Sequence, residues 1–258
     1  MSIKDELDTL LQTKTLMKQA LIDKGVEVSD TDSFASYVGK IESITSGGIP
    51  KGYTELQYLE KTVQDNSYVD LSYKATKDTT AVLDFSVTNW TSVTGYNPQA
   101  FFGHQGGVST SSFGLFGVPV STSDLATRYV HGASFGTRTS VSTITILPNQ
   151  IYKYKLGPNE CSIDDVVVDT YSNRNDMVSD YLWLFRINAV SSVSSHYSKD
   201  NTCVRGKIYN LKFYEGEELT RDLVPVQRKD TLVYGLYDKI EGYFLPVSVN
   251  SSFTGIAK

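Results

Sequence analysis

The first residues of the chain repeat hydrophobic positions with the period of a helix. The spacing alternates between four and three residues, with Lys14 as the one polar interruption, and it predicts a helix over residues 4–24. Gly25 is placed to end that helix, because glycine accepts the left-handed conformation of a C-terminal cap. The pattern fits two alternatives equally: a short coiled-coil seam, or an amphipathic helix lying on its own domain or on a partner. The repeating positions are Ile3, Leu7, Leu10, Met17 and Leu21.

A second helix is predicted from about Asp32 to Ile44. We expect Ser29 to cap it, with Asp32 as the acidic residue three positions on. Tyr37 and Val38 share one face with two further apolar residues. Two short helices resemble a helix-turn-helix, but they lack a basic recognition face, so we do not expect DNA binding. The predicted oligomerisation or anchor residues are Leu7, Leu10, Met17, Leu21, Phe34 and Ile41.

Glycine, serine and proline cluster at residues 45–52 and stop the helical pattern. Such a composition indicates a flexible joint. We therefore divide the chain into a helical segment at 1–46, a linker at 47–52 and a second domain at 53–258.

From Tyr53 onward the pattern changes to short runs with a period of two, separated by turn formers. Many strands and no helical stretch predict two packed antiparallel sheets in one mainly β domain, a β-sandwich. The expected strands are 55–60, 68–73, 80–87, 100–103, 113–118, 127–130, 140–147, 151–156, 160–168, 181–187, 204–214, 223–228, 233–238 and 243–246.

Composition and charge exclude some classes of function. The 258 residues include 17 tyrosines and 11 phenylalanines, which favour strands, and the formal net charge of -5 argues against nucleic-acid binding. The charged start is not that of a secretory signal, and no window approaches the roughly 20 apolar residues that span a membrane. Cys161 and Cys203 lack metal-site spacing; they could pair on neighbouring strands, but buried thiols are the preferred interpretation.

Catalytic chemistry finds little support in the sequence. The three histidines are scattered, and adjacent Asp164 and Asp165 would point to opposite faces of a strand, so a hairpin turn is the preferred interpretation there. We predict no enzyme activity, no cofactor and no bound metal. Calcium on Asp176, Asp180 or Asp200 is the alternative to ordinary solvated carboxylates.

Sugar binding is the recognition chemistry that the sequence favours. An aromatic ring exposed on a loop can stack on a sugar while polar side chains orient the hydroxyl groups. Trp183 lies in an apolar run and is expected to belong to the core instead. The candidate carbohydrate-binding residues are Trp90, Tyr96, His104, Tyr129, His131 and Tyr197.

Several stretches of the second domain resemble a laminin-G/concanavalin A-like family that is common in tail and fibre proteins of bacteriophages and prophages. The most specific stretch is Gly206–Gly216, followed by Leu219–Val226, Gly235–Lys239 and Gly242–Phe244. The tail, Pro246–Gly255, departs from the family's usual ending, which leaves the last turn open. Shorter similarities lie at Gly52–Glu60, Tyr68–Leu71, Phe101–Gly103 and Leu184–Arg186.

The resemblance implies a jelly-roll sandwich of the lectin type. Residues 10–25 and 34–41 are also similar to short leaders that attach phage fibre and decoration domains to the particle. Together these similarities imply a virion structural protein, made in the host cytoplasm without a signal peptide. It would be trimeric, would contact other virion proteins through its N-terminal segment, and could bind host glycans. The alternatives are a carbohydrate-active enzyme on the same sandwich and a bacterial surface adhesin.

Overall fold

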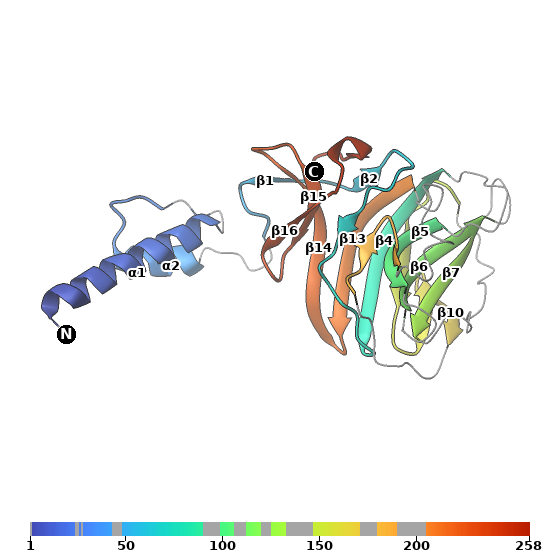
Figure 1. Ribbon diagram of the computed structural model, residues 1–258, viewed down its shortest axis with the longest axis horizontal. Coiled ribbons are helices and arrows are strands. Elements are labelled where there is room, and N and C mark those ends of the chain that lie inside the picture. Colours follow the sequence, from blue (N-terminus) through green and yellow to red (C-terminus); the bar gives the residue numbers. More distant parts are fainter. Residues whose placement is uncertain are drawn as a thin grey trace.

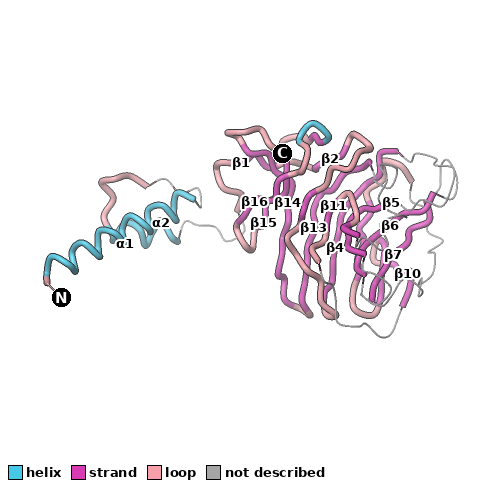
Figure 2. Tube along the Cα trace, viewed as in Figure 1, coloured by secondary structure: helices cyan, strands magenta, loops and turns pink. Residues whose placement is uncertain are grey.

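The computed structural model describes residues 2–23, 26, 28–42, 48–89, 99–105, 112–119, 125–132, 147–170, 180–189 and 205–258. Strands dominate these ranges, and α-helices occur only in the N-terminal segment (Figure 2). The helices lie apart from the sheets, and the C-terminus lies at the sandwich (Figure 1). The predicted mainly β class, with a helix at the N-terminus, is confirmed.

Two helices form the N-terminal hairpin, α1 (Ile3–Asp23) and α2 (Phe34–Glu42). Ser2 caps α1 reciprocally: the N–H of Asp5 donates to Ser2 Oγ at 3.2 Å, and the N–H of Ser2 donates to Asp5 Oδ2 at 2.8 Å. The predicted Ser29 cap of α2 is wrong. Because α2 begins only at Phe34, the cap is Ser33, whose Oγ accepts from the N–H of Ser36 at 3.2 Å.

The predicted anchor residues of the two helices differ in how far they are exposed to solvent. Leu21 is buried within the hairpin, as is Tyr37 of α2, while Met17 and Phe34 are half-buried. Leu7 and Leu10 are 56% and 57% exposed, and Ile41 is 47% exposed. The C-terminal half of α1 is therefore used inside the chain, whereas the N-terminal half presents leucines to solvent.

The larger sheet contains 11 of the described strands, all paired antiparallel. Its main order is β10-β9-β8-β4-β13-β14-β15-β16; β2 continues along β13 beyond β14, and β1 and β17 pair with β14 and β2. The bounds are β1 (Tyr53–Glu55), β2 (Leu59–Lys61), β4 (Thr79–Asn89), β8 (Tyr152–Leu156), β9 (Glu160–Ile163), β10 (Val166–Thr170), β13 (Arg205–Glu215), β14 (Glu218–Arg228), β15 (Tyr234–Asp238), β16 (Tyr243–Pro246) and β17 (Phe253–Thr254).

The smaller sheet contains six of the described strands, in the order β3-β11-β5-β6-β7, with β12 paired parallel to β5. In Figure 1 it faces the larger sheet as a second layer. The predicted strand at 140–147 lies almost wholly outside the described residues. The bounds are β3 (Val69–Asp70), β11 (Trp183–Leu184), β5 (Gln99–Gln105), β6 (Ser112–Pro119), β7 (Leu125–Gly132) and β12 (Asn188–Ala189).

Aromatic side chains join the two sheets. Phe85 of β4 meets Phe101 of β5 edge-on with ring centroids 4.6 Å apart, and Phe102 meets Phe213 of β13 at 6.5 Å. All four rings are buried. Such burial is worth about 1.5–3 kcal/mol per side chain, so these contacts help to hold the two sheets together within the larger core.

Two turns test particular sequence predictions. Asp164 and Asp165 have φ of 49° and 63° and join antiparallel β9 to β10, which confirms the predicted hairpin. The last turn, which the sequence left open, contains a short 3₁₀ helix, η2 (Asn250–Ser252), followed by β17. The chain end thus closes against β2 of the larger sheet.

Candidate ligand-binding site

Two stacked aromatic rings lie on the outer face of the smaller sheet. Tyr68, just before β3, and Trp183 of β11 have ring centroids 4.0 Å apart with an 18° angle between the planes. Both side chains are half-buried. The expectation that Trp183 belongs to the core is therefore wrong: Leu184, the next residue, takes the buried position instead.

The register of β3 and β11 explains the outward direction of these rings. Leu184 pairs with Val69, and both are fully buried, so their neighbours along each strand point away from the core. Trp183 accordingly lies opposite Asp70 on the outer face. Tyr68 is two residues before Asp70 and shares that face.

Glycines occupy the next two positions across the sheet from Trp183. Trp183 pairs with Gly103 of β5, and Gly103 pairs with Gly114 of β6. A Cβ at Gly103 would lie 2.5 Å from the Phe113 carbonyl oxygen, and one at Gly114 would lie 2.4 Å from that of Phe102. The close approach of the two backbones requires glycine here, and it leaves bare backbone beside the tryptophan.

Arg186 lies beside the stacked pair. Its guanidinium carbon is 5.4 Å from the Trp183 centroid and 5.9 Å from the Tyr68 centroid. Since the two centroids are themselves only 4.0 Å apart, the guanidinium sits at the rim of the stack and not over the open face of either ring. One nitrogen, Nη1, donates a hydrogen bond to the carbonyl oxygen of Asn66 at 3.2 Å.

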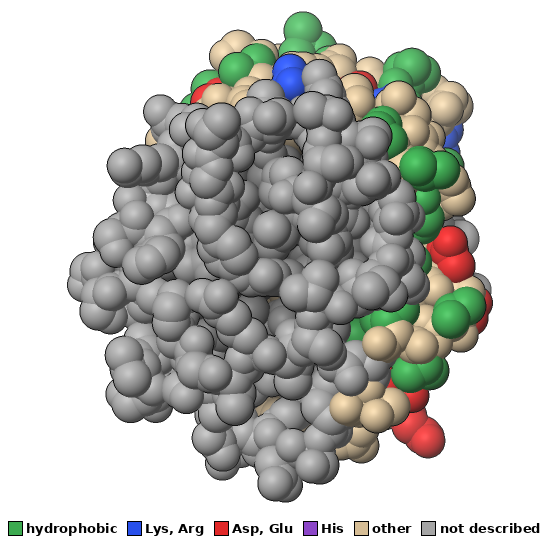
Figure 3. Space-filling view, turned by 90° about the vertical axis from the view of Figure 1, so that its right-hand side faces the viewer, with side chains coloured by type: hydrophobic (Ala, Val, Ile, Leu, Met, Phe, Trp, Pro, Cys, Tyr) green, Lys and Arg blue, Asp and Glu red, His purple; other side chains and the backbone are tan. Residues whose placement is uncertain are grey.

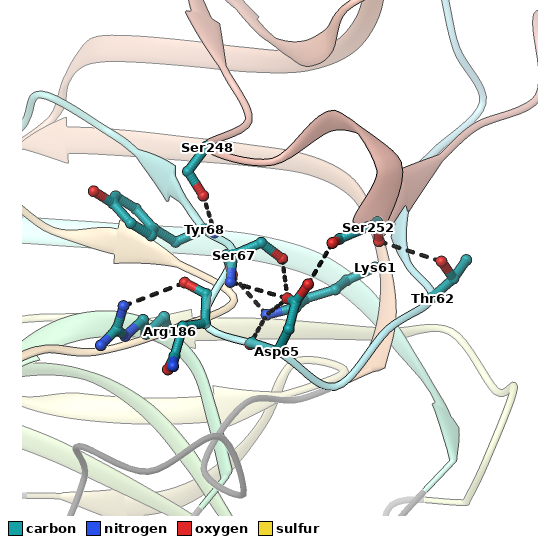
Figure 4. A network of polar contacts seen from close by, with 9 residues as sticks. Lys61, Thr62, Asp65, Ser67, Tyr68, Arg186, Ser248 and Ser252 are labelled. Carbon is teal, nitrogen blue, oxygen red and sulfur yellow. Dashed lines mark hydrogen bonds and ion pairs between the residues drawn. The ribbon is translucent and has the colours of Figure 1, made fainter.

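A buried lysine organises the loop that carries Asn66 and Tyr68 (Figure 4). Lys61 ends β2 with no exposed surface, and its Nζ donates to the carbonyl oxygens of Asp65 at 2.8 Å and Ser67 at 2.6 Å. The carboxylate of Asp65 lies 3.5 Å from the same nitrogen. The carbonyl that holds Arg186 thus stands between two carbonyls that are held by Lys61.

Asp65 ties this loop to the C-terminal 3₁₀ helix. Its Oδ2 accepts a hydrogen bond from the Ser252 hydroxyl, and its Oδ1 accepts from the Ser67 N–H at 2.9 Å. Burial raises the pKa of Asp65, but the hydrogen bonds from Ser252 and Ser67 and the charge of Lys61 outweigh it and leave the pKa below its ordinary value. The N–H of Tyr68 donates a hydrogen bond to Ser248 Oγ at 2.8 Å, so the backbone that carries the Tyr68 ring is held in place.

A second arginine lies among aromatic rings near the ends of β14, β15 and β16. The guanidinium of Arg221 is 5.7 Å from the Tyr73 ring and 5.5 Å from the Tyr243 ring. It forms ion pairs with fully buried Asp238 at 3.3 Å and with Glu241 at 2.7 Å. The N–H groups of Arg221 point too far from these carboxylate oxygens to form hydrogen bonds with them.

Tyr73 belongs to the same neighbourhood and is stacked on Phe213, with centroids 4.3 Å apart. Its hydroxyl donates to Glu215, at the end of β13. Burial, together with that bond to the carboxylate, raises the pKa of Tyr73 to about 12. The phenol therefore stays protonated at physiological pH and acts as a structural donor.

The structure places the predicted sugar-binding residues in three groups. His104 is buried on the core side of β5, and burial lowers its pKa, so the expectation that it is an accessible ligand contact is wrong. Tyr129 and His131 lie on β7, but their side chains are outside the described part. Trp90, Tyr96 and Tyr197 lie outside the described residues altogether.

Three further findings on the described residues concern metals, cysteines and membranes. No group of three or more His, Cys, Asp or Glu side chains among them could hold a metal ion, and Asp176 and Asp200 lie outside these ranges. Cys161 is buried in β9, while Cys203 is not described. No described helix has the length and apolar character to cross a membrane. Where described residues reach the surface in Figure 3, hydrophobic side chains alternate with acidic and other polar ones.

No known family model matches the sequence, and no curated protein matches it.

Sequence reasoning missed the residues that form this site: Tyr68, Asp70, Trp183 and Arg186. A signal was present in Tyr68-Val69-Asp70-Leu71, where polar and apolar residues alternate. It indicates an outward Tyr68 and Asp70, but not the partners that lie more than a hundred residues away. Only the pairing of β3 with β11 brings those partners together.

Proposed function

We propose that the protein is a non-enzymatic structural component of a bacteriophage particle whose β domain, of the concanavalin/laminin-G type, binds host surface glycans. The observation that supports glycan binding is the Tyr68–Trp183 stack on the outer face of the smaller sheet, with Asp70 beside it and Arg186 at its rim. Aromatic surface receives the apolar face of a sugar ring, while a carboxylate and a guanidinium bond its oxygen atoms.

The N-terminal hairpin is proposed to attach the domain to the particle and to associate copies of the chain into a trimer. Support comes from Leu7 and Leu10, two leucines of one helical seam that are more than half exposed. Burying such a seam against other helices removes apolar surface from water. The identity as a virion protein rests on the sequence resemblance alone.

Glycan binding is tested with full-length protein on an array of bacterial surface polysaccharides. We expect binding that Trp183→Ala removes and that Tyr209→Ala leaves intact. Tyr209 is a matched control because it is a half-buried aromatic on the outer face of the other sheet, 5.9 Å from Tyr58. Absence of binding to every polysaccharide by the wild-type protein would overturn the glycan-binding proposal.

Association through the hairpin is tested by light scattering of the Leu7→Asp/Leu10→Asp double variant. We expect the trimer to become a monomer while the near-ultraviolet circular dichroism of the β domain stays unchanged, because both positions lie on α1. Leu16→Asp is the matched control, since Leu16 is 65% exposed on α1 but does not belong to the heptad positions. A trimer that survives the double substitution would place the association in the sandwich.

A further inference from the structure

We propose that the glycan ligand carries a carboxylate, as uronic acids do, and that Arg186 receives it. This inference rests on the proposed glycan binding and adds the chemical class of the sugar. It depends on how the positive charge of Arg186 is satisfied within the chain.

Arg186 lacks an acidic partner in the part of the chain that the structure describes. Every described ion pair involves other residues, and the one described hydrogen bond of Arg186 goes to a backbone carbonyl, that of Asn66. A guanidinium has five N–H donors in a planar fork that matches a carboxylate. Most of these donors therefore remain available at the rim of the aromatic stack.

The loop beneath Arg186 holds the guanidinium in a defined position. Lys61 fixes the carbonyls of Asp65 and Ser67, on either side of the Asn66 carbonyl that accepts from Arg186. The Asp65 carboxylate is occupied by Lys61, Ser67 and Ser252. An arginine fixed in this way loses little conformational entropy when it binds an anion.

Asp70 does not neutralise Arg186: no described hydrogen bond or ion pair joins the two side chains, and the described bond of Arg186 goes to the Asn66 carbonyl. One Asp70 oxygen accepts from the Ser72 N–H at 2.8 Å, which leaves the other to accept from a sugar hydroxyl. The site thus offers both an acceptor for hydroxyl groups, on Asp70, and a donor for an anion, on Arg186.

The test compares uronic-acid-containing capsular polysaccharides with their carboxyl-reduced counterparts, which keep the same rings but carry CH₂OH in place of the carboxylate. Binding to full-length protein is measured by biolayer interferometry. We expect the native polymers to bind at least about tenfold more tightly than the reduced ones, and Arg186→Gln to abolish that difference. Arg186→Lys keeps the charge without the fork and should retain only part of the difference.

The matched control is Lys207→Gln. The Nζ of Lys207 lies 4.3 Å from the Tyr58 ring centroid on the outer face of the larger sheet, whereas the proposed site lies on the smaller sheet. This variant should bind as the wild type does. Equal binding of native and reduced polymers would overturn the carboxylate inference while leaving glycan binding intact. Acid preference that persists in both Arg186 variants would also overturn it. Failure of the wild-type protein to bind any polymer, native or reduced, would overturn both proposals.

Discussion

Two half-buried arginines lie beside aromatic rings in this protein, and they differ in what neutralises their charge. Arg221, whose side chain is 16% exposed, pairs with buried Asp238 and with Glu241. Arg186 bonds a carbonyl oxygen, and no described carboxylate lies within ion-pair distance of it. The charge of Arg221 is therefore neutralised by carboxylates of the protein itself, whereas Arg186 keeps N–H donors that can bind a ligand.

The surroundings of the two arginines support the same distinction. Around Arg221, Asp238 also accepts the backbone N–H groups of Ile240 at 3.0 Å and Glu241 at 3.3 Å, which ties the turn between β15 and β16. Around Arg186, the buried charge belongs instead to Lys61 in the loop below. An arginine beside aromatic rings therefore indicates a ligand site only where no acidic side chain of the protein neutralises it.

The largest expected effect is that of Arg221→Met. It leaves the fully buried carboxylate of Asp238 without its cation, so the free energy of unfolding should fall by about 3 kcal/mol, measured by urea denaturation. Adding Asp238→Asn should cost less than the sum of the two single changes, because the uncompensated charge is gone. Strict additivity would mean that the pair does not interact.

Lys61→Met should lower the free energy of unfolding by about 2 kcal/mol, because the carbonyls of Asp65 and Ser67 lose a buried donor. It should also weaken glycan binding by loosening the loop below Arg186. Lys153→Met is the control: Lys153 pairs with Asp165 but is 46% exposed, so its loss should change little. Equal effects of the two substitutions would show that burial of Lys61 contributes nothing.

Acidification should destabilise the loop between β2 and β3, which Lys61 and Asp65 hold in place. The folded-state pKa of Asp65 lies below its unfolded value of about 3.9, so the stabilisation is present above that pH and is lost as the pH falls through the folded pKa. The stability gap between wild type and Asp65→Asn, measured by urea denaturation from pH 7 to pH 2.5, should be about 1 kcal/mol at neutral pH and should shrink below about pH 4. A gap that is constant with pH would exclude ionised Asp65 as its source.

The smallest expected effect on stability is that of Arg186→Gln. Because the side chain bonds one carbonyl and neutralises no described carboxylate, the free energy of unfolding should change by less than about 0.5 kcal/mol in urea denaturation. A loss comparable to that of Arg221→Met would remove the distinction between the two arginines.

Local patterns sufficed for part of this architecture. The four-three spacing predicts α1, the alternation along 204–214 predicts β13, and adjacent Asp164 and Asp165 predict the hairpin. These features depend on contacts between residues close in sequence, which side-chain periodicity reports directly. The Ser29 cap failed because residues 29–32 form a turn of their own, in which the Ser29 N–H donates to Asp32 Oδ2 at 2.7 Å and the Asp32 N–H donates to the Ser29 carbonyl at 3.2 Å, so the helix begins only after it.

By itself, the sequence determined most of the longer elements and the mainly β class of this protein, but only the tertiary structure decided which side chains face the solvent. In Tyr181-Leu182-Trp183-Leu184-Phe185 every residue is hydrophobic, so no alternation marks the outer face, and Phe185, with φ of 64°, interrupts the strand. Pairing with Val69 and Phe102 turns Leu184 inward and Trp183 outward, while pairing with Phe113 turns His104 inward. The physical reason is that strand pairing and register join segments far apart in sequence, and a shift of one residue would exchange the buried and exposed faces.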